Sequence, residues 1–226
     1  MDRELSDGEF VSCLERAGIL KSVAISKNLE GFRDAKGLKH LICRWYPSLH
    51  TFFFFVGELT ITLEDVVNNF LLPVFGEENP FDVSLSSEDL EVEDKLFSHF
   101  GERTASPSRK QARMGKWVMN LSREKDKAIR RAGFSTFWLS KILFSEFPGY
   151  GVKSVFFPLT IRLARGAQYP LAPIFLGYVY SQLDLLHGDE VLCYHFIPSL
   201  CHSPGIHVGP LFCYFGEVQE FEICKR

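Results

Sequence analysis

The feature that most constrains the fold is the run of residues 45–76, whose apolar pattern changes from strand to helix within a few positions. Two short runs of aromatic and β-branched residues flank Gly57 and Glu58. A two-residue gap containing Gly is typical of a β-hairpin, because Gly accepts a positive φ at little cost. We therefore predict a small β-hairpin near residues 51–62.

A helix start signal follows the hairpin directly. Thr62 and Asp65 have the spacing of a capping box, in which the hydroxyl accepts a backbone amide and the carboxylate reaches back to the cap. Glu64 and Asp65 also suit the positive end of the helix dipole. Pro73 and Gly76 are expected to end this helix. The predicted buried stripe is Val66, Val67, Phe70 and Leu71.

Apolar residues at helical spacing predict further helices along the chain. The expected helices are 10–18, 31–45, 87–100 (capped by Ser86 or Ser87) and the basic stretch 109–131. Three apolar segments follow, 134–147, 155–164 and 171–187, the last apolar nearly all round, as in a buried helix that ends at Gly188. The predicted fold class is mainly α, a multi-helix globular domain with one small hairpin.

The length of 226 residues, with 46% hydrophobic residues and 22 Phe, is enough for one substantial core. We divide the chain into a helical N-terminal extension (1–30), a helical core (31–190) and a segment rich in Pro, Gly and aromatic residues (191–226) that packs on or extends that core. Pro, Gly and Gln interrupt the uncharged stretches, so no membrane span is predicted. The charged N-terminus is unlike a secretion signal, which favours reduced thiols in the nucleus or cytosol.

The net charge of −3 conceals two opposite blocks. Residues 77–102 carry nine acids and one Lys, and residues 103–131 carry ten bases and two acids. The basic block is the best nucleic-acid candidate, with phosphate contacts from Lys and Arg and a Trp that could stack on a base. The alternative is a solvated helix face, or neutralisation within the fold by the adjacent acidic block 77–102. The candidate contact residues are Arg109, Lys110, Arg113, Lys116 and Trp117.

No catalytic, cofactor or metal site is predicted from the residues. The Cys and His residues after position 190 lack the closely spaced pairs of structural zinc sites, so buried thiols are the favoured interpretation. The chain has no Gly-x-Ser-x-Gly elbow and no glycine-rich phosphate loop. Lys27 and Lys141 follow serines, but nothing around them resembles a pyridoxal site.

The motifs in order resemble the plant mobile domain family, also labelled aminotransferase-like. The matching residues of the first run are Trp45, His50, Thr51, Phe52, Gly57, Glu58, Thr60, Thr62, Leu63, Glu64, Asp65, Val66, Leu72, Pro73, Val74 and Gly76. Later matches are the Phe-Trp-Leu-Ser motif around Trp138, the run ending at Gly166, and the helix with Tyr180 and Leu183. Two departures are Val56, where the family usually has Trp, and Leu71, where it usually has Gly.

The resemblance implies a non-enzymatic, transposon-derived protein of the nucleus. Relatives are linked to meristem maintenance, transposon silencing and genome stability through protein–protein interaction, some with phosphatase-like partners. The aminotransferase-like label implies no activity here, and no catalytic residue or cofactor carries over. The alternative is a nucleic-acid-binding remnant of a transposon protein that uses residues 103–131.

Overall fold

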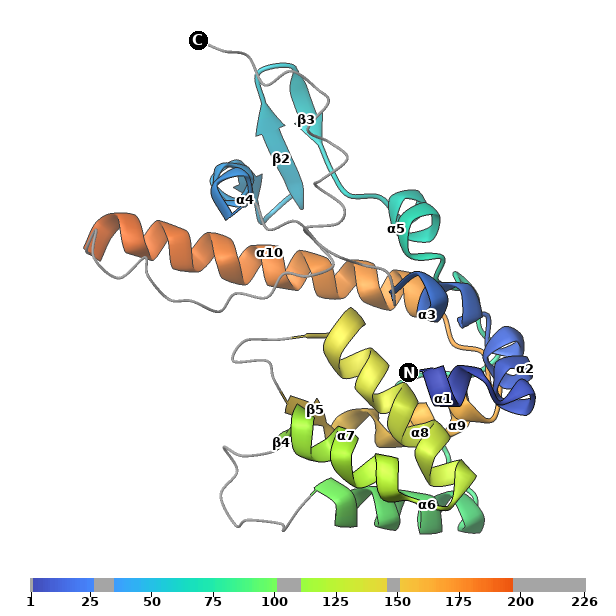
Figure 1. The fold of residues 1–226 in the computed structure, drawn as a ribbon. Helices are drawn as coiled ribbons and strands as arrows, with labels where there is room; N and C mark the ends of the chain where they lie inside the picture. Colours follow the sequence, from blue (N-terminus) through green and yellow to red (C-terminus); the bar gives the residue numbers. More distant parts are fainter. Residues whose placement is uncertain (1, 27–34, 101–110, 146–150, 197–226) are drawn as a thin grey trace.

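A computed structural model describes residues 2–26, 35–100, 111–145 and 151–196 of the chain (Figure 1). Helices dominate these residues, as predicted for a mainly α domain. The first half contains α1 (Asp2–Leu5), α2 (Gly8–Arg16), α3 (Leu20–Ser26), α4 (Ala35–Ile42), β1 (Trp45–Tyr46), β2 (Thr51–Phe54), β3 (Gly57–Leu59), α5 (Leu63–Phe70) and α6 (Ser87–Phe100). The second half contains β4 (Gln111–Arg113), α7 (Met114–Arg123), α8 (Lys127–Trp138), a π-helical turn (Leu139–Leu143), β5 (Gly151–Lys153), a 3-10 turn (Ser154–Phe156), α9 (Phe157–Ala164) and α10 (Leu171–Phe196).

The long helix α10 separates two parts of the fold (Figure 1). The hairpin strands β2 and β3 stand on one side of it, together with α4. The bundle of α6, α7, α8 and α9 lies on the other side. The sheet has the order β1-β2-β3, with both pairs antiparallel, which confirms the predicted hairpin and adds a short strand before it. The predicted turn at Gly57-Glu58 is wrong, because these two residues pair with Phe54 and Phe53 as part of β3, and the turn is Phe55-Val56.

Large aromatic rings fill the core of the bundle. Trp117 on α7 stacks on Phe157 of α9 with ring centroids 5.6 Å apart, and Phe97 and Phe100 of α6 meet the same Phe157 ring edge-on. Rings of this size bury much apolar surface, and edge-to-face pairs add to the stabilisation. Part of the Phe-rich composition therefore serves the core of the bundle.

The predicted helix 109–131 is wrong, because the chain forms β4, α7 and the start of α8 there. The Glu124 carboxylate accepts the amides of Lys125 and Asp126, and Asp126 accepts the amide of Ala128 as the N-cap of α8. Acceptors at this spacing end one helix and begin the next. The pairing of β4 with β5 was also not predicted.

Two other helix ends differ from the sequence prediction. The second predicted helix stops at Ile42, and Trp45 belongs to β1, although Leu38, Leu41 and Ile42 do pack against the core. Helix α10 continues through Gly188 to Phe196, so Gly188 is not its C-cap. Gly inside a helix costs about 1 kcal/mol relative to Ala, which a long buried helix tolerates.

Both predicted helix caps are present in the structure. The Thr62 hydroxyl accepts the Asp65 amide at 3.2 Å, and the Asp65 carboxylate accepts the Thr62 amide at 2.7 Å. Ser86 and Asp89 form the same reciprocal pair at the start of α6. Helix α5 ends at Leu71, whose φ of 50° and ψ of 39° are left-handed. The family's Gly at this position therefore has a physical reason, since L side chains are disfavoured there.

Substitution of Leu71 tests this left-handed cap. We expect Leu71→Gly to be more stable than Leu71→Ala by about 1 kcal/mol, because only Gly adopts this backbone without strain. Urea unfolding of both variants measures the difference. The exposed α5 residue Asn68 is the matched control, where Ala should be more stable than Gly. If the Ala variant were more stable than the Gly variant at position 71, as at position 68, the assignment of strain to Leu71 would be contradicted.

Candidate functional site

The family-motif residues of the sheet converge on α10. The Trp45 indole N–H donates to Asp184 Oδ1 at 2.7 Å, and the other carboxylate oxygen lies 3.5 Å from His50 Nε2. The His50 ring stacks on Tyr180 with centroids 4.7 Å apart and an interplanar angle of 11°. One carboxylate and one phenol ring of α10 thus hold two motif residues of the sheet.

Hydrogen bonds to the backbone complete this joint. The Thr60 hydroxyl donates to the His50 carbonyl at 2.5 Å, and the Tyr180 hydroxyl donates to the Ile61 carbonyl at 2.5 Å. His50 has a φ of 52°, an uncommon conformation for a residue with a side chain. The contacts of Thr60 and Tyr180 fix the chain on both sides of the hairpin. The arrangement positions the strands, and we name these residues (Trp45, His50, Thr60, Tyr180 and Asp184) the hairpin joint.

The hairpin joint is partly open to solvent. The side chains of His50 and Asp184 are 45% and 38% exposed, whereas Trp45 is buried. A His–carboxylate pair is half of a familiar catalytic arrangement, but the Asp184 carboxylate is shared with the buried indole. Because both oxygens have structural partners, the pair is explained by the docking of the hairpin.

Two substitutions separate the two roles of Asp184, as hydrogen-bond acceptor for Trp45 and as a negative charge. Asp184→Ala leaves the buried Trp45 indole N–H without an acceptor, and we expect a loss of about 1–3 kcal/mol of unfolding free energy. Asp184→Asn keeps an oxygen for Trp45 and should retain most of the stability. Urea unfolding followed by circular dichroism measures both. Equal losses in the two variants would show that the negative charge, and not the acceptor for Trp45, is what stabilises the joint.

The end of the motif run makes a second tight contact. A Cβ atom on Gly76 would lie 2.5 Å from the Tyr169 Cα atom, so only Gly fits at this crossing of two backbones. The Pro73 carbonyl accepts the Ala172 amide at 2.9 Å at the start of α10. Pro73 and Gly76 therefore attach the chain after α5 to the segment that leads into α10.

Next to this crossing lies a small polar cluster of Glu78, Arg162 and Tyr169. The Arg162 guanidinium forms an ion pair with Glu78, and the Tyr169 hydroxyl donates to the same carboxylate at 2.6 Å. The Arg162 hydrogen bond, followed by that of Tyr169, holds the pKa of Glu78 below its usual value despite partial burial. Burial and the neighbouring carboxylate raise the pKa of Tyr169.

The lowered pKa of Glu78 predicts a pH dependence of stability. The charged carboxylate stabilises the fold above its unfolded pKa, near 4.5, and that stabilisation is lost as the pH falls through the lower folded pKa. Glu78→Gln should therefore be clearly less stable than the wild type at pH 7 and nearly equal to it near pH 2. Urea midpoints across this range measure the difference. A pH-independent difference would rule out the charge as its cause.

An exposed apolar surface lies on the hairpin itself. Phe55 and Val56, at the turn between β2 and β3, are 106% and 85% exposed. Tyr46 and Phe53 lie next to each other on the sheet's outer face, with ring centroids 5.5 Å apart, and Leu59 is exposed on β3. Exposed apolar groups that cluster on one element mark sites of contact with other molecules. We call these residues (Tyr46, Phe53, Phe55, Val56 and Leu59) the hairpin surface.

The predicted nucleic-acid residues are not brought together as a stacking site. Trp117 is fully buried, and its indole N–H donates to the Gly133 carbonyl at 3.2 Å. The prediction that this ring stacks on a base is therefore wrong. Lys116 is exposed on α7. Arg109 and Lys110, together with the side chain of Arg113, lie outside the described residues.

Acids of the N-terminal helices neutralise much of the remaining basic block. Arg130 contacts Glu4 at 2.9 Å, and Arg131 contacts Asp7 and Glu9 at 2.8 and 2.7 Å. The hydrogen bond from Arg131 holds the pKa values of Asp7 and Glu9 below their usual range. These partners come from α1, α2 and the N-cap of α2, whereas the sequence suggested the acidic block 77–102. Nucleic-acid binding by the exposed bases that remain stays a prediction.

The other motif residues have structural positions. Trp138 is fully buried and donates its indole N–H to the Ser26 hydroxyl at 2.9 Å. Thr51 lies half-buried in β2, while Glu58 on β3 and Glu64 on α5 are exposed. Asp184 was missed by the sequence analysis, although it is the only charged residue of the apolar segment 171–187, which was a usable signal.

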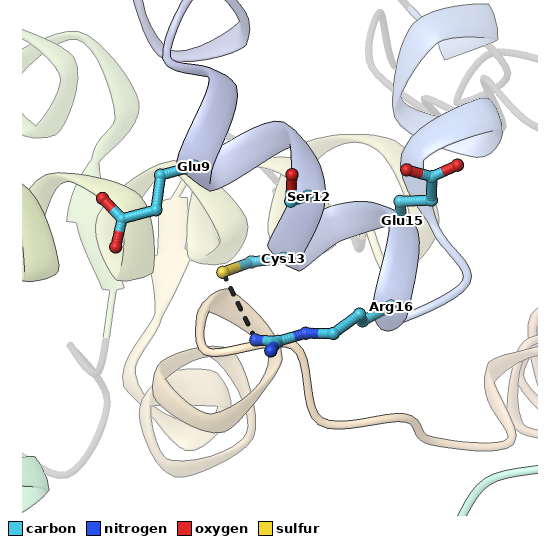
Figure 2. Close-up of a pocket in the computed structure, with 5 residues that line it drawn as sticks. All are labelled: Glu9, Ser12, Cys13, Glu15 and Arg16. Carbon is cyan, nitrogen blue, oxygen red and sulfur yellow. Dashed lines mark hydrogen bonds between the residues drawn. The ribbon is translucent and has the colours of Figure 1, made fainter.

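A small pocket on α2 brings together Cys13 and Arg16 (Figure 2). The Arg16 guanidinium lies 3.6 Å from the Cys13 sulfur and also donates to the Arg165 carbonyl at 2.5 Å. Glu9 and Glu15 point away from this pair (Figure 2). The described residues contain no group of His, Cys, Asp and Glu side chains that could hold a metal ion. The side chains of the Cys and His residues after position 190, where buried thiols were predicted, lie outside the described residues.

Comparison with known protein families identifies the family of this chain. Residues 18–200 match the plant mobile domain. The chain belongs to the plant mobile domain family. This family is transposon-derived. The chain has no significant match among the curated proteins or the solved structures with which it was compared. Within the described part of the chain, no helix is long and apolar enough to span a bilayer.

The motif residues of this plant mobile domain thus have a shared role. Trp45 and His50 attach the hairpin to α10, Thr62 and Asp65 begin α5, and Gly76 allows the close crossing near Tyr169. Each contact joins segments far apart in the sequence or caps a helix. The division into 1–30, 31–190 and 191–226 stays a prediction, while Phe10 and Leu14 of α2 are fully buried in the common core.

Proposed function

We propose that this plant mobile domain protein is a non-enzymatic interaction protein that binds another protein through the hairpin surface. We place it in the nucleus, in transposon silencing, genome stability and meristem maintenance. Membership of the transposon-derived family supports this setting. The single observation that carries the contact surface is the exposure of Phe55 and Val56 at the end of a rigidly attached hairpin.

The chemistry of the hairpin surface suits a protein partner. Aromatic residues are enriched at the energetic centres of protein interfaces, because they bury large area with few rotatable bonds. Arg44 lies over the inward Phe54 ring at 5.5 Å, and Glu58 is exposed beside the apolar residues. A polar margin around an apolar centre is the usual arrangement of such interfaces. By family resemblance, a phosphatase-like protein is the expected partner.

The non-enzymatic part of the proposal rests on the roles of the polar side chains. Asp184, Glu78 and Arg131 each bind structural partners, and His50 is stacked and fixed by the joint. Lys141, which was considered for a pyridoxal site, lies exposed against the Phe137 ring at 5.4 Å. Asp184, Glu78, Arg131 and His50 are therefore explained by contacts that hold the fold together.

Affinity purification from plant nuclei tests the contact surface. We expect the double variant Phe55→Ser with Val56→Ser to recover partner proteins at least tenfold less than the wild-type chain does. The matched control is Phe81→Ser, which removes another highly exposed ring (86%) from the loop before α6. Circular dichroism confirms that all three proteins are folded. Equal recovery by the hairpin variant and the control would contradict the proposal.

A further inference from the structure

Three side chains form a row across the outer face of the sheet, Tyr46 on β1, Phe53 on β2 and Glu58 on β3. Phe53 and Glu58 are partners in the β2-β3 ladder, so their side chains lie next to each other on the same face. The Phe53 amide donates to the Arg44 carbonyl on the β1 side, which makes the Phe53–Glu58 pair the non-hydrogen-bonded kind with the closer side chains. Tyr46 meets Phe53 edge-on from the other side, with ring centroids 5.5 Å apart and an interplanar angle of 85°. We call Tyr46, Phe53 and Glu58 the outer-face row.

The outer-face row is exposed, and no cation pairs with its carboxylate among the residues that the structure describes. Tyr46 and Phe53 are 49% and 42% exposed, and Glu58 is exposed as well. Arg44 is the nearest cation along the chain, and its guanidinium lies over the inward Phe54 ring, 5.5 Å from the centroid. Neither the hairpin joint nor a helix cap uses Glu58. Two rings beside one carboxylate are the chemistry that binds a cation.

The same arrangement binds a cation elsewhere in this chain. The guanidinium of Arg131 lies over the Phe10 ring, 5.8 Å from the centroid. Phe10 in turn meets Phe134 edge-on, with centroids 5.7 Å apart and an interplanar angle of 88°. Asp7 and Glu9 accept hydrogen bonds from the same guanidinium at 2.8 and 2.7 Å. In this fold, an edge-on ring pair with neighbouring carboxylates therefore holds one arginine between α2 and α8.

The outer-face row repeats the ring pair and the carboxylate of the Arg131 site on an open surface. The two ring pairs have nearly the same separation and angle. An arginine suits the row better than a lysine, because its planar, weakly hydrated guanidinium stacks on a ring while it donates two hydrogen bonds to a carboxylate. We propose that the outer-face row binds an arginine side chain of the partner protein. This inference rests on the proposed function and names the group that anchors the partner.

The carboxylate of Glu58 also determines the class of partner. It repels the phosphate groups of nucleic acid or of an anionic membrane, whereas an arginine gains from both the rings and the charge. Phe55 and Val56 lie in the turn, one ladder pair beyond Phe53 and Glu58. A partner segment in which an apolar residue neighbours the arginine therefore covers the row and the turn together.

Titration of the full-length protein with a capped Gly-Arg-Gly peptide, followed by NMR, tests the outer-face row directly. We expect saturable shifts of the Phe53 and Glu58 amide signals. A capped Gly-Lys-Gly peptide should bind several-fold more weakly, because an ammonium group does not stack on a ring as a guanidinium does. The matching peptide with citrulline, which has the shape of arginine without its charge, should leave both signals in place.

Substitutions separate the contributions of the charge and of the rings. Glu58→Gln keeps the size of the side chain, and we expect it to bind the arginine peptide roughly threefold more weakly, the loss typical of one exposed ion pair. Phe53→Leu keeps an apolar side chain and removes the ring, with a loss of similar size from the missing cation–π contact. The matched control is Glu64→Gln, which neutralises an exposed acid of α5 and should bind as the wild type does.

Failure of this inference can be distinguished from failure of the proposed function. The double variant Phe55→Ser with Val56→Ser should bind the arginine peptide with unchanged affinity, because neither residue belongs to the outer-face row. Partner recovery that does not depend on these two residues would contradict the proposed function and leave the arginine site in place. Partner recovery that does depend on them, without peptide binding by the wild type, would contradict the arginine site alone.

Several results would overturn the proposal. Binding of the citrulline peptide as tight as that of the arginine peptide, or equal affinities of Glu58→Gln and the Glu64→Gln control, would show that the charge is not recognised. Equal binding of the lysine peptide would overturn the choice of arginine. Shifts of the same amides when the protein alone is concentrated would identify a second copy as the occupant, and shifts caused by a short single-stranded DNA would identify nucleic acid.

Discussion

The hydrogen bond from the buried Trp45 indole to Asp184 is the contact on which the attachment of the sheet β1-β2-β3 to α10 depends. An indole N–H removed from water needs an acceptor, and the apolar helix α10 provides a single carboxylate at the matching height. The same carboxylate approaches His50, whose ring is clamped on Tyr180. The short sheet could not be stable alone, and this joint attaches it rigidly to the longest helix of the domain.

The position of the hairpin follows from this attachment and bears on function. The sheet is held on the side of α10 away from the bundle (Figure 1), so its turn and outer face have no neighbours from α6–α9. On the other side, Arg130 and Arg131 form ion pairs with acids of the N-terminal segment. These pairs neutralise two positive charges of the segment that was predicted to contact nucleic acid. This placement supports our proposal of apolar contact at the hairpin.

Local signals in the sequence predicted local structure well. The capping box of Thr62 and Asp65 and the cap at Ser86 each depend on residues within four positions of one another. The hairpin was also predicted, although its turn lies two residues before the Gly57-Glu58 gap. The basic stretch 109–131 was mispredicted, because its break depends on Glu124 and Asp126 acting as backbone acceptors inside a charged run. The role of Trp117 could not be predicted, since its stacking on Phe157 joins residues forty positions apart.

A double-mutant cycle between Trp45 and Asp184 tests the joint most directly. Trp45→Phe removes the indole N–H but keeps an aromatic ring, and Asp184→Leu removes the acceptor but keeps an apolar body on α10. The account predicts that the two single losses of unfolding free energy are not additive, with a coupling of about 1–3 kcal/mol for directly bonded residues. Losses that add to within about 0.3–0.5 kcal/mol would contradict it.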